Sequence, residues 1–242
     1  MQYYTVRAFT IILLFILSSC GDSAKKTKSS SAEKVKDTTV IDSAKIKETQ
    51  QKKEEEKPFV LTEDNAIPFF FEYQKEHTEH IVKINTSIGS FVVDLYNQTP
   101  YHRAHFIYLT KKKYFNNTYF HRVVKNCIIQ GGNTDMMSTA KKRDSIGFYL
   151  LPPDTKKGLK HNRGVMSMPS SDDVANPHKL ASPFEFFIVT AKNGAHHLDG
   201  KYTAFGRVIS GMDVVDKINN VPAGKDEWPL KNVLIKSVEI LE

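Results

Sequence analysis

Cysteine is scarce in this sequence: Cys20 and Cys127 are the only two among 242 residues. So few cysteines exclude the small disulfide-rich scaffolds of secreted proteins. Zinc fingers and ribbons are excluded too, because their cysteines stand a few residues apart. Two pairs of histidines have the spacing of one helix face, yet neither pair has a third ligand at a recognisable distance along the chain. We therefore expect no metal site.

Long apolar runs are also missing. The longest one, residues 11–17, is too short to span a bilayer as a helix. It follows Arg7 and has the length of a signal-peptide core. The next letters, Leu17-Ser18-Ser19-Cys20, resemble the bacterial lipobox, in which the cysteine is lipidated and becomes the first mature residue.

We accordingly predict a lipoprotein signal peptide over residues 1–19 and lipidation at Cys20. An ordinary cleaved signal or a short anchor is the alternative. A lipid anchor would place the protein in the cell envelope, bound to a membrane with its domain in the periplasm or at the cell surface. If Cys20 carries lipid, Cys127 has no partner for an intrachain disulfide.

No block of one charge sign stands out either. The net charge is +7, but residues 21–57 mix 10 lysines with 8 acidic residues. No Lys/Arg block is interleaved with aromatic residues, so we expect no nucleic-acid binding. Residues 20–57 contain hardly any large apolar side chain, and such a composition cannot bury enough surface to fold. We interpret them as a disordered tether that reaches about 35 Å.

Short strand-like runs dominate from residue 81 onward. Two stretches have helical character, one opened by Thr99-Pro100 and one over residues 211–218. The sequence has no β–α–β rhythm, so it favours a mainly β fold: a closed antiparallel β-barrel of about eight strands capped by two α-helices. This domain would cover residues 81–242. Residues 58–80 would form an N-terminal extension with a short helix, and residues 133–163 would be rich in loops.

Residues 120–132 contain the most informative pattern. Two apolar runs flank a polar break, and strand alternation predicts that Phe120, Arg122 and Val124 share one face of the first run. Ile128 and Gln130 would share a face of the second run. An arginine, an aliphatic side chain and a carboxamide suit a shallow pocket that holds an apolar group and directs hydrogen-bond donors at its edge.

Five motifs in order resemble the cyclophilins, the peptidyl-prolyl cis–trans isomerases. They are Phe120-His121-Arg122, Gln130-Gly131-Gly132, residues 164–168, Phe186-Phe187-Ile188 and residues 197–206. The resemblance implies an enzyme that accelerates rotation about Xaa-Pro bonds, which face a barrier of about 18–20 kcal/mol. A donor aimed at the proline nitrogen binds the twisted amide better than either planar form, so no cofactor is needed.

The resemblance also implies roles for individual residues. Arg122 would be the catalytic donor, Gln130 would orient it, and Phe187 would form the floor of the proline pocket. Phe120 and His121 would support the site. The other substrate-binding positions implied are Cys127, Ile128, Pro169, Ser170, Glu185, His197, Leu198 and Tyr202.

Several of these positions depart from the family pattern. Cys127 stands where the family generally has a phenylalanine, which predicts a wider and less apolar pocket. His197 stands where some members have a tryptophan, and this replacement, although compatible with the family, predicts weaker binding of cyclosporin-type ligands. Glu185 replaces a glutamine and could pair with Arg122. A catalytically weak module that binds proline-containing peptides in the same groove is therefore the alternative to the enzyme.

A hydrolase lacks support, because Ser167 has no Gly-x-Ser-x-Gly elbow. The partners expected are proline-containing polypeptides, above all exported proteins during folding, and the membrane through the lipid anchor. We expect a monomer.

Overall fold

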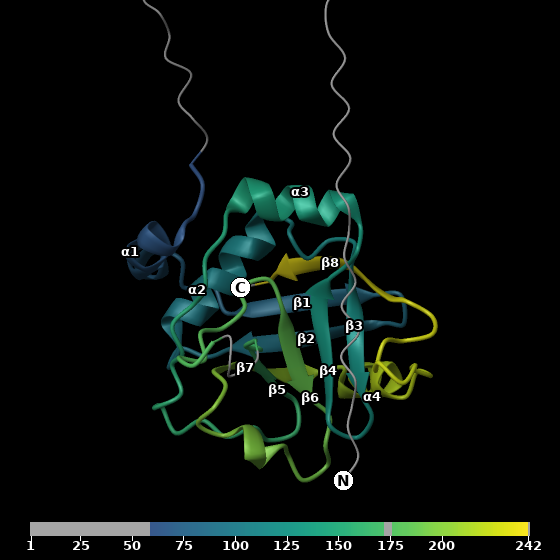
Figure 1. The fold of residues 1–242 in the computed structure, drawn as a ribbon. Coiled ribbons are helices and arrows are strands. Elements are labelled where there is room, and N and C mark those ends of the chain that lie inside the picture. The colour runs from purple at the N-terminus through teal and green to yellow at the C-terminus, as the bar shows by residue number, and fades with distance from the viewer. Residues whose placement is uncertain (1–58, 172–175, 242) are drawn as a thin grey trace, which may run out of the picture. The chain divides into compact units, whose positions relative to one another are not determined.

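The computed structural model describes residues 59–171 and 176–241. They form eight strands, four α-helices and one short 3₁₀ helix (Figure 1). The strands are β1 (Ile81–Thr86), β2 (Ser90–Leu95), β3 (Thr118–Val124), β4 (Ile128–Asn133), β5 (Val165–Ser167), β6 (Phe186–Val189), β7 (Ala204–Ser210) and β8 (Val233–Ile240). The helices are α1 (Glu63–Glu76), α2 (Pro100–Lys111), α3 (Met137–Ile146), α4 (Met212–Asn219) and the 3₁₀ turn η1 (His196–Leu198).

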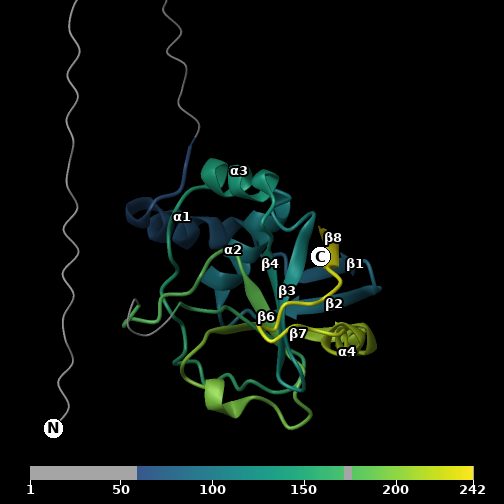
Figure 2. The ribbon, with the colours of Figure 1, turned by 45° about the vertical axis from the view of Figure 1, so that its right-hand side comes forward.

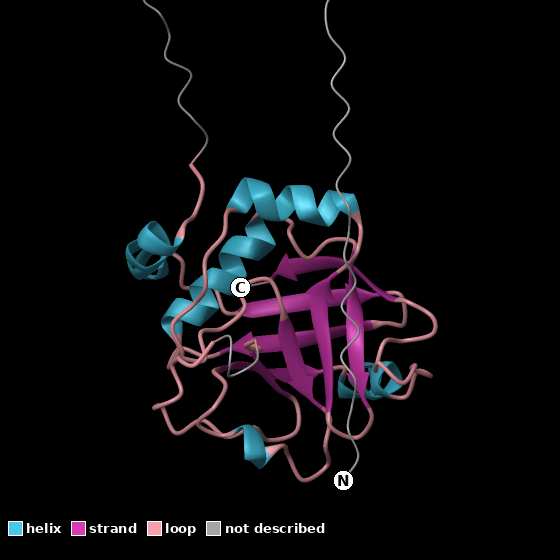
Figure 3. Ribbon diagram, in the orientation of Figure 1, coloured by secondary structure: helices cyan, strands magenta, loops and turns pink. Residues whose placement is uncertain are grey.

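The strands close into one barrel in the order β1-β2-β7-β5-β6-β4-β3-β8, and every neighbouring pair is antiparallel. The predicted closed barrel of eight strands is confirmed. Full closure leaves no unpaired sheet edge. Figure 3 shows the strands in magenta with the helices outside them.

Two helices close the barrel at its two ends, as the resemblance implied. Strand β2 leads into Thr99 and α2 at its C-terminal end, while Gly89, just before its first residue, contacts Val214 of α4. Phe106 of α2 stacks on Phe115 with ring centroids 4.6 Å apart and lies in the main apolar core. Figure 2, which is turned from the view of Figure 1, shows α2 and α4 well apart on the barrel.

The extension before the barrel packs onto it through α1. Thr62 caps this helix in a capping box with Asn65, and Phe70 is fully buried among aromatic side chains of α2 and the loop after α3. Tyr101 donates to the carbonyl of Ala66 at 3.3 Å, and the Leu61 amide donates to the Ile146 carbonyl at 2.8 Å. The extension thus shares the core of the barrel.

Two local expectations are wrong. Residues 137–146, expected to be loop, form helix α3, whose low apolar content hides it in the sequence. Phe120 and Arg122 do not share a face, because the β3–β4 register shifts between them. This bulge turns Phe120 into the main core while Arg122 and Val124 face the outer side.

Residues 1–58 lie outside the described part of the chain, and so do the predicted signal peptide, Cys20 and the tether. None of the helices in the described part is long and apolar enough to cross a membrane.

Candidate active site

One cavity of about 270 Å³ gathers most of the residues expected to bind substrate. It opens on the outer side of the barrel, where β3, β4 and β6 lie side by side. Its lining consists of Arg122, Ile128, Gln130, Pro169, Ser170, Phe187, Leu198 and Tyr202. All eight positions belong to the set that the sequence predicted.

Phe187 supplies a rigid apolar surface in this cavity. It is 3% exposed and belongs to an apolar cluster, separate from the main core, that includes Ile128 and Ala204. Tyr202 meets it edge-on with ring centroids 5.8 Å apart, and His161 stacks parallel to it at 6.0 Å. These two rings restrict Phe187, which suits it to receive a small apolar ring such as that of proline.

Arg122 reaches the same cavity from β3 with its guanidinium held on two sides. Nε donates to the Glu227 carboxylate at 2.7 Å, and Nη1 lies 3.4 Å from Oε1 of Gln130. Within the described residues Nη2 donates to no protein atom. The sequence suggested Glu185 as the carboxylate partner of Arg122, but the structure gives that place to Glu227, which lies 105 residues away along the chain.

Glu185 instead stands behind Gln130. Its carboxylate accepts hydrogen bonds from Gln130 Nε2 at 2.7 Å and Asn133 Nδ2 at 2.8 Å, and it lies 3.5 Å from Nε2 of His121. Burial opposes its ionisation, yet the interactions with His121, Gln130 and Asn133 prevail and lower its pKa. Because a carboxylate only accepts, Gln130 must turn its NH₂ group to Glu185 and its oxygen to Arg122.

Besides Glu185, four of the residues proposed for the site do not line this cavity. Cys127 is half-buried against the apolar cluster that contains Phe187, where burial raises the pKa of its thiol. His197 is exposed on η1. Phe120 belongs to the main core, and His121 lies between Glu185 and the Trp228 ring, whose centroid is 5.8 Å away.

A Ser–His–Asp chain lies beside the site, which no sequence motif indicated. His161 Nε2 is 3.0 Å from Ser167 Oγ, and its Nδ1 is 3.0 Å from Asp199 Oδ1. Burial lowers the pKa of His161 against the pull of Asp199, whose own pKa is lowered to about 2 because bonds from His161 and His196 outweigh burial. Ser167 is fully buried and its Oγ donates to the Thr203 carbonyl at 2.7 Å, so no substrate can reach it. The hydrogen bonds of His161 to Ser167 and Asp199 fix its ring against Phe187, and this arrangement does not support a hydrolase.

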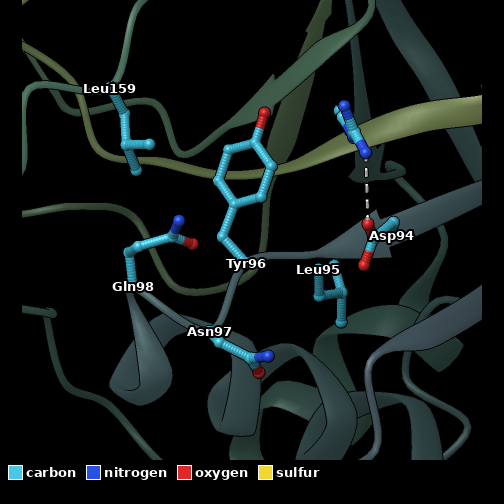
Figure 4. Close-up of a pocket in the computed structure, with 7 residues that line it drawn as sticks. Asp94, Leu95, Tyr96, Asn97, Gln98 and Leu159 are labelled. Carbon is cyan, nitrogen blue, oxygen red and sulfur yellow. Dashed lines mark ion pairs between the residues drawn. The ribbon is translucent and has the colours of Figure 1, made fainter.

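A second hollow, of about 420 Å³, lies where β2 leads into α2 (Figure 4). Its lining is mainly polar and includes Tyr96, Asn97, Gln98 and an Asp94–Arg207 ion pair of 3.8 Å. An apolar proline ring fits the Phe187 floor of the first cavity better than this polar lining. Among the residues described, no three His, Cys, Asp or Glu side chains are placed to hold a metal ion.

Comparisons with known proteins agree with this geometry. The family model described as "Cyclophilin type peptidyl-prolyl cis-trans isomerase/CLD" matches residues 81–240. A peptidyl-prolyl cis-trans isomerase from Acinetobacter baylyi is 35% identical over 168 residues, 66% of this chain and 85% of that protein. The peptidyl-prolyl cis-trans isomerase-like 3 of Dictyostelium discoideum is 34% identical over 161 residues, again 66% of this chain and 94% of that protein. The match to the isomerase-like 2 protein of Rhizopus delemar, 36% identical over 70% of this chain, spans only 30% of that longer protein.

A crystal structure of a Cryptosporidium parvum cyclophilin type peptidyl-prolyl cis-trans isomerase is also similar. It has a TM-score of 0.57 and 28% identity, over 68% of this chain and 98% of that one. The chain belongs to the cyclophilin family, and its barrel is a peptidyl-prolyl cis–trans isomerase domain of the cyclophilin type.

Proposed function

We propose that this isomerase assists the folding of exported proteins from a lipid anchor at the cell envelope, with Arg122 as its catalytic donor. The observation that supports it best is that Arg122 and Phe187 line the same cavity. A proline ring seated on Phe187 would place its imide bond next to the arginine.

The reaction needs only a donor that prefers the twisted amide. Twisting the Xaa-Pro bond localises the lone pair on the proline nitrogen, which then accepts a hydrogen bond that the planar amide cannot accept well. Nη2 of Arg122 donates to no described protein atom and is available for that bond. Every ~1.4 kcal/mol of preference for the twisted state makes exchange tenfold faster.

The substrate class follows from the cavity and from a relative. Pro169, Ser170 and Leu198 line the cavity together with Phe187, so it offers both an apolar floor and polar groups for a proline-containing segment. The same Cryptosporidium isomerase has also been crystallised in the presence of the dipeptide Ala-Pro, and that structure matches this one with a TM-score of 0.56 and 28% identity. We infer that proline-containing polypeptides bind in this cavity.

The anchor rests on the sequence alone. The apolar run of residues 11–17 and the cysteine after Leu17-Ser18-Ser19 support lipidation of Cys20, and residues 21–57 would supply the tether. Mass spectrometry of the mature N-terminus and cell fractionation of the native protein beside Cys20→Ser test it. We expect a diacylated Cys20 in the membrane fraction and release of the variant. An unmodified mature protein, soluble in both forms, contradicts the anchor.

Refolding of a secreted protein limited by a slow prolyl isomerisation tests the folding role. This phase lasts tens to hundreds of seconds without a catalyst. The full-length protein should shorten it at substoichiometric amounts, and Phe187→Ala should not. Saturable binding of the unfolded chain without a shorter phase would favour the peptide-binding module instead.

A further inference from the structure

We propose that Glu227 is a positioning residue for the isomerase reaction: its carboxylate fixes Arg122 so that Nη2 points at the bound proline. The inference deepens the function proposed above and rests on Arg122 as the donor. Glu227 lies in the loop between α4 and β8, far in sequence from every motif of the site.

The loop that carries Glu227 is a small hydrogen-bonded hairpin. Ala223 pairs with Pro229, and the Gly224 amide donates to the Trp228 carbonyl at 2.8 Å. The Glu227 amide closes the turn on the Gly224 carbonyl at 3.1 Å. The hairpin therefore holds the Glu227 backbone in place before any substrate binds.

The hairpin contacts three consecutive residues of β3. The Trp228 ring packs on His121. The Glu227 carboxylate accepts a hydrogen bond from Nε of Arg122 at 2.7 Å, and the Glu227 carbonyl accepts one from the Val123 amide at 2.8 Å. The backbone hydrogen bond between Glu227 and Val123 thus fixes the position of the Glu227 carboxylate relative to β3. A side chain placed at random on the surface would lack this double attachment.

The Glu227 backbone is strained, and a residue that only filled space at this position would not need a carboxylate side chain on a strained backbone. Its φ is 64°, in the left-handed region that residues with a Cβ adopt rarely. Strain of this kind persists where the surrounding structure imposes it and often marks functional positions. Glycine would satisfy this conformation better, but glycine has no carboxylate to offer Arg122.

The position of the carboxylate favours positioning over inhibition. Glu227 is absent from the lining of the proline cavity and lines a separate hollow, beyond Val123 and Val124. It binds Nε, Gln130 binds Nη1, and Nη2 donates to no atom of the described residues. Two fixed contacts restrict a guanidinium that would otherwise sample many rotamers, so less order is lost when the transition state forms.

Exchange NMR of an Ala-Pro peptide with the full-length protein tests the inference. Glu227→Gln keeps a neutral acceptor and should lower kcat about threefold with little change in KM, while Glu227→Gly should lower it about tenfold. Because glycine relieves the positive φ, Glu227→Gly should not lower the melting temperature. Asp226→Asn is the matched control: it removes the neighbouring carboxylate, which caps the Trp228 amide at 3.3 Å, and should leave kcat unchanged.

A spectroscopic signal separates positioning from a structural role. The ¹H–¹⁵N resonance of Arg122 Nε, assigned by its loss in Arg122→Lys, should shift and broaden in Glu227→Gln but not in Asp226→Asn. In an Arg122→Ala background, Glu227→Gln should have no further effect on exchange. Unchanged or faster exchange in both Glu227 variants, with Arg122→Ala inactive, overturns the inference alone. Full activity of Arg122→Ala overturns the proposed function instead.

Discussion

Replacing Glu185 by glutamine, the residue that the family pattern has there, should weaken both stability and catalysis in this chain. Glu185 accepts from Gln130 and Asn133, and the NH₂ group of the introduced side chain would face one of these donors. Asn133 cannot turn round, because its Oδ1 already accepts from Thr134 N at 2.8 Å and Arg143 Nη2 at 2.7 Å. Gln130 would flip instead and present its NH₂ group to Arg122.

The magnitude follows from the bonds that change. Hydrogen bonds to a charged group contribute about 1.5–3 kcal/mol and neutral ones about 1 kcal/mol, so Glu185→Gln should cost about 1–2 kcal/mol of unfolding free energy. The exchange rate should fall two- to fivefold, roughly the effect of 0.5–1 kcal/mol in the transition state. Glu72→Gln is the control, because the Glu72 side chain is 69% exposed and its surface pair with Lys75 contributes little.

The pH dependence gives a sharper check. The pKa of Glu185 is lowered from 4.5 in the folded state, so its ionisation stabilises the fold above the unfolded pKa. This advantage is lost as the pH falls through the lowered folded value. The unfolding free energies of native protein and Glu185→Gln, measured with urea, should therefore differ most near pH 7 and converge as the pH falls through the lowered folded pKa of Glu185. A constant difference from pH 7 to pH 3 would refute the role given to the Glu185 carboxylate.

Three further predictions concern the cavity and the extension. Phe187→Ala should raise KM at least tenfold and lower the free energy of unfolding by about 3–5 kcal/mol, since it removes a buried ring from the floor of the proline cavity. Peptide titrations at a temperature where the variant stays folded measure the change in KM. Phe70→Ala should lower the unfolding free energy by about 3–5 kcal/mol with kcat unchanged, and a loss below 1 kcal/mol by urea titration would show that α1 is not part of the barrel core. Cys127→Phe should tighten peptide binding less than fivefold, because Cys127 packs against the apolar cluster and does not line the cavity; a gain of a hundredfold in a calorimetric titration would contradict that placement.

Much of the barrel and of its cavity could be predicted because the information is local. Strand alternation, glycine pairs and the Thr99-Pro100 helix start each lie within a few residues, and the motifs that carry the resemblance hold Arg122, Gln130 and Phe187. The bulge after Phe120 could not be predicted, since it depends on how β3 pairs with β4. Helix α3 escapes prediction because few apolar residues mark its buried side.

The supporting contacts could not be predicted for a different reason. Glu227 meets Arg122 only because the α4–β8 hairpin lies against β3 in the closed barrel. Asp199 lies 38 residues beyond His161, and only the fold brings it into hydrogen-bond contact with the His161 ring, which also contacts Ser167. The spacing of these residues along the sequence does not indicate which of them are in contact. Only the fold shows that Glu185 accepts a hydrogen bond from Gln130 and that Glu227 accepts one from Arg122.

The most direct test of the central claim is cis–trans exchange of an Ala-Pro peptide, measured by NMR with the full-length protein and with Arg122→Ala. We expect the native protein to accelerate exchange and the variant to bind the peptide but lose most of the acceleration. Equal acceleration by both proteins would contradict Arg122 as the donor. Binding without acceleration by the native protein would contradict the catalytic interpretation of the cavity.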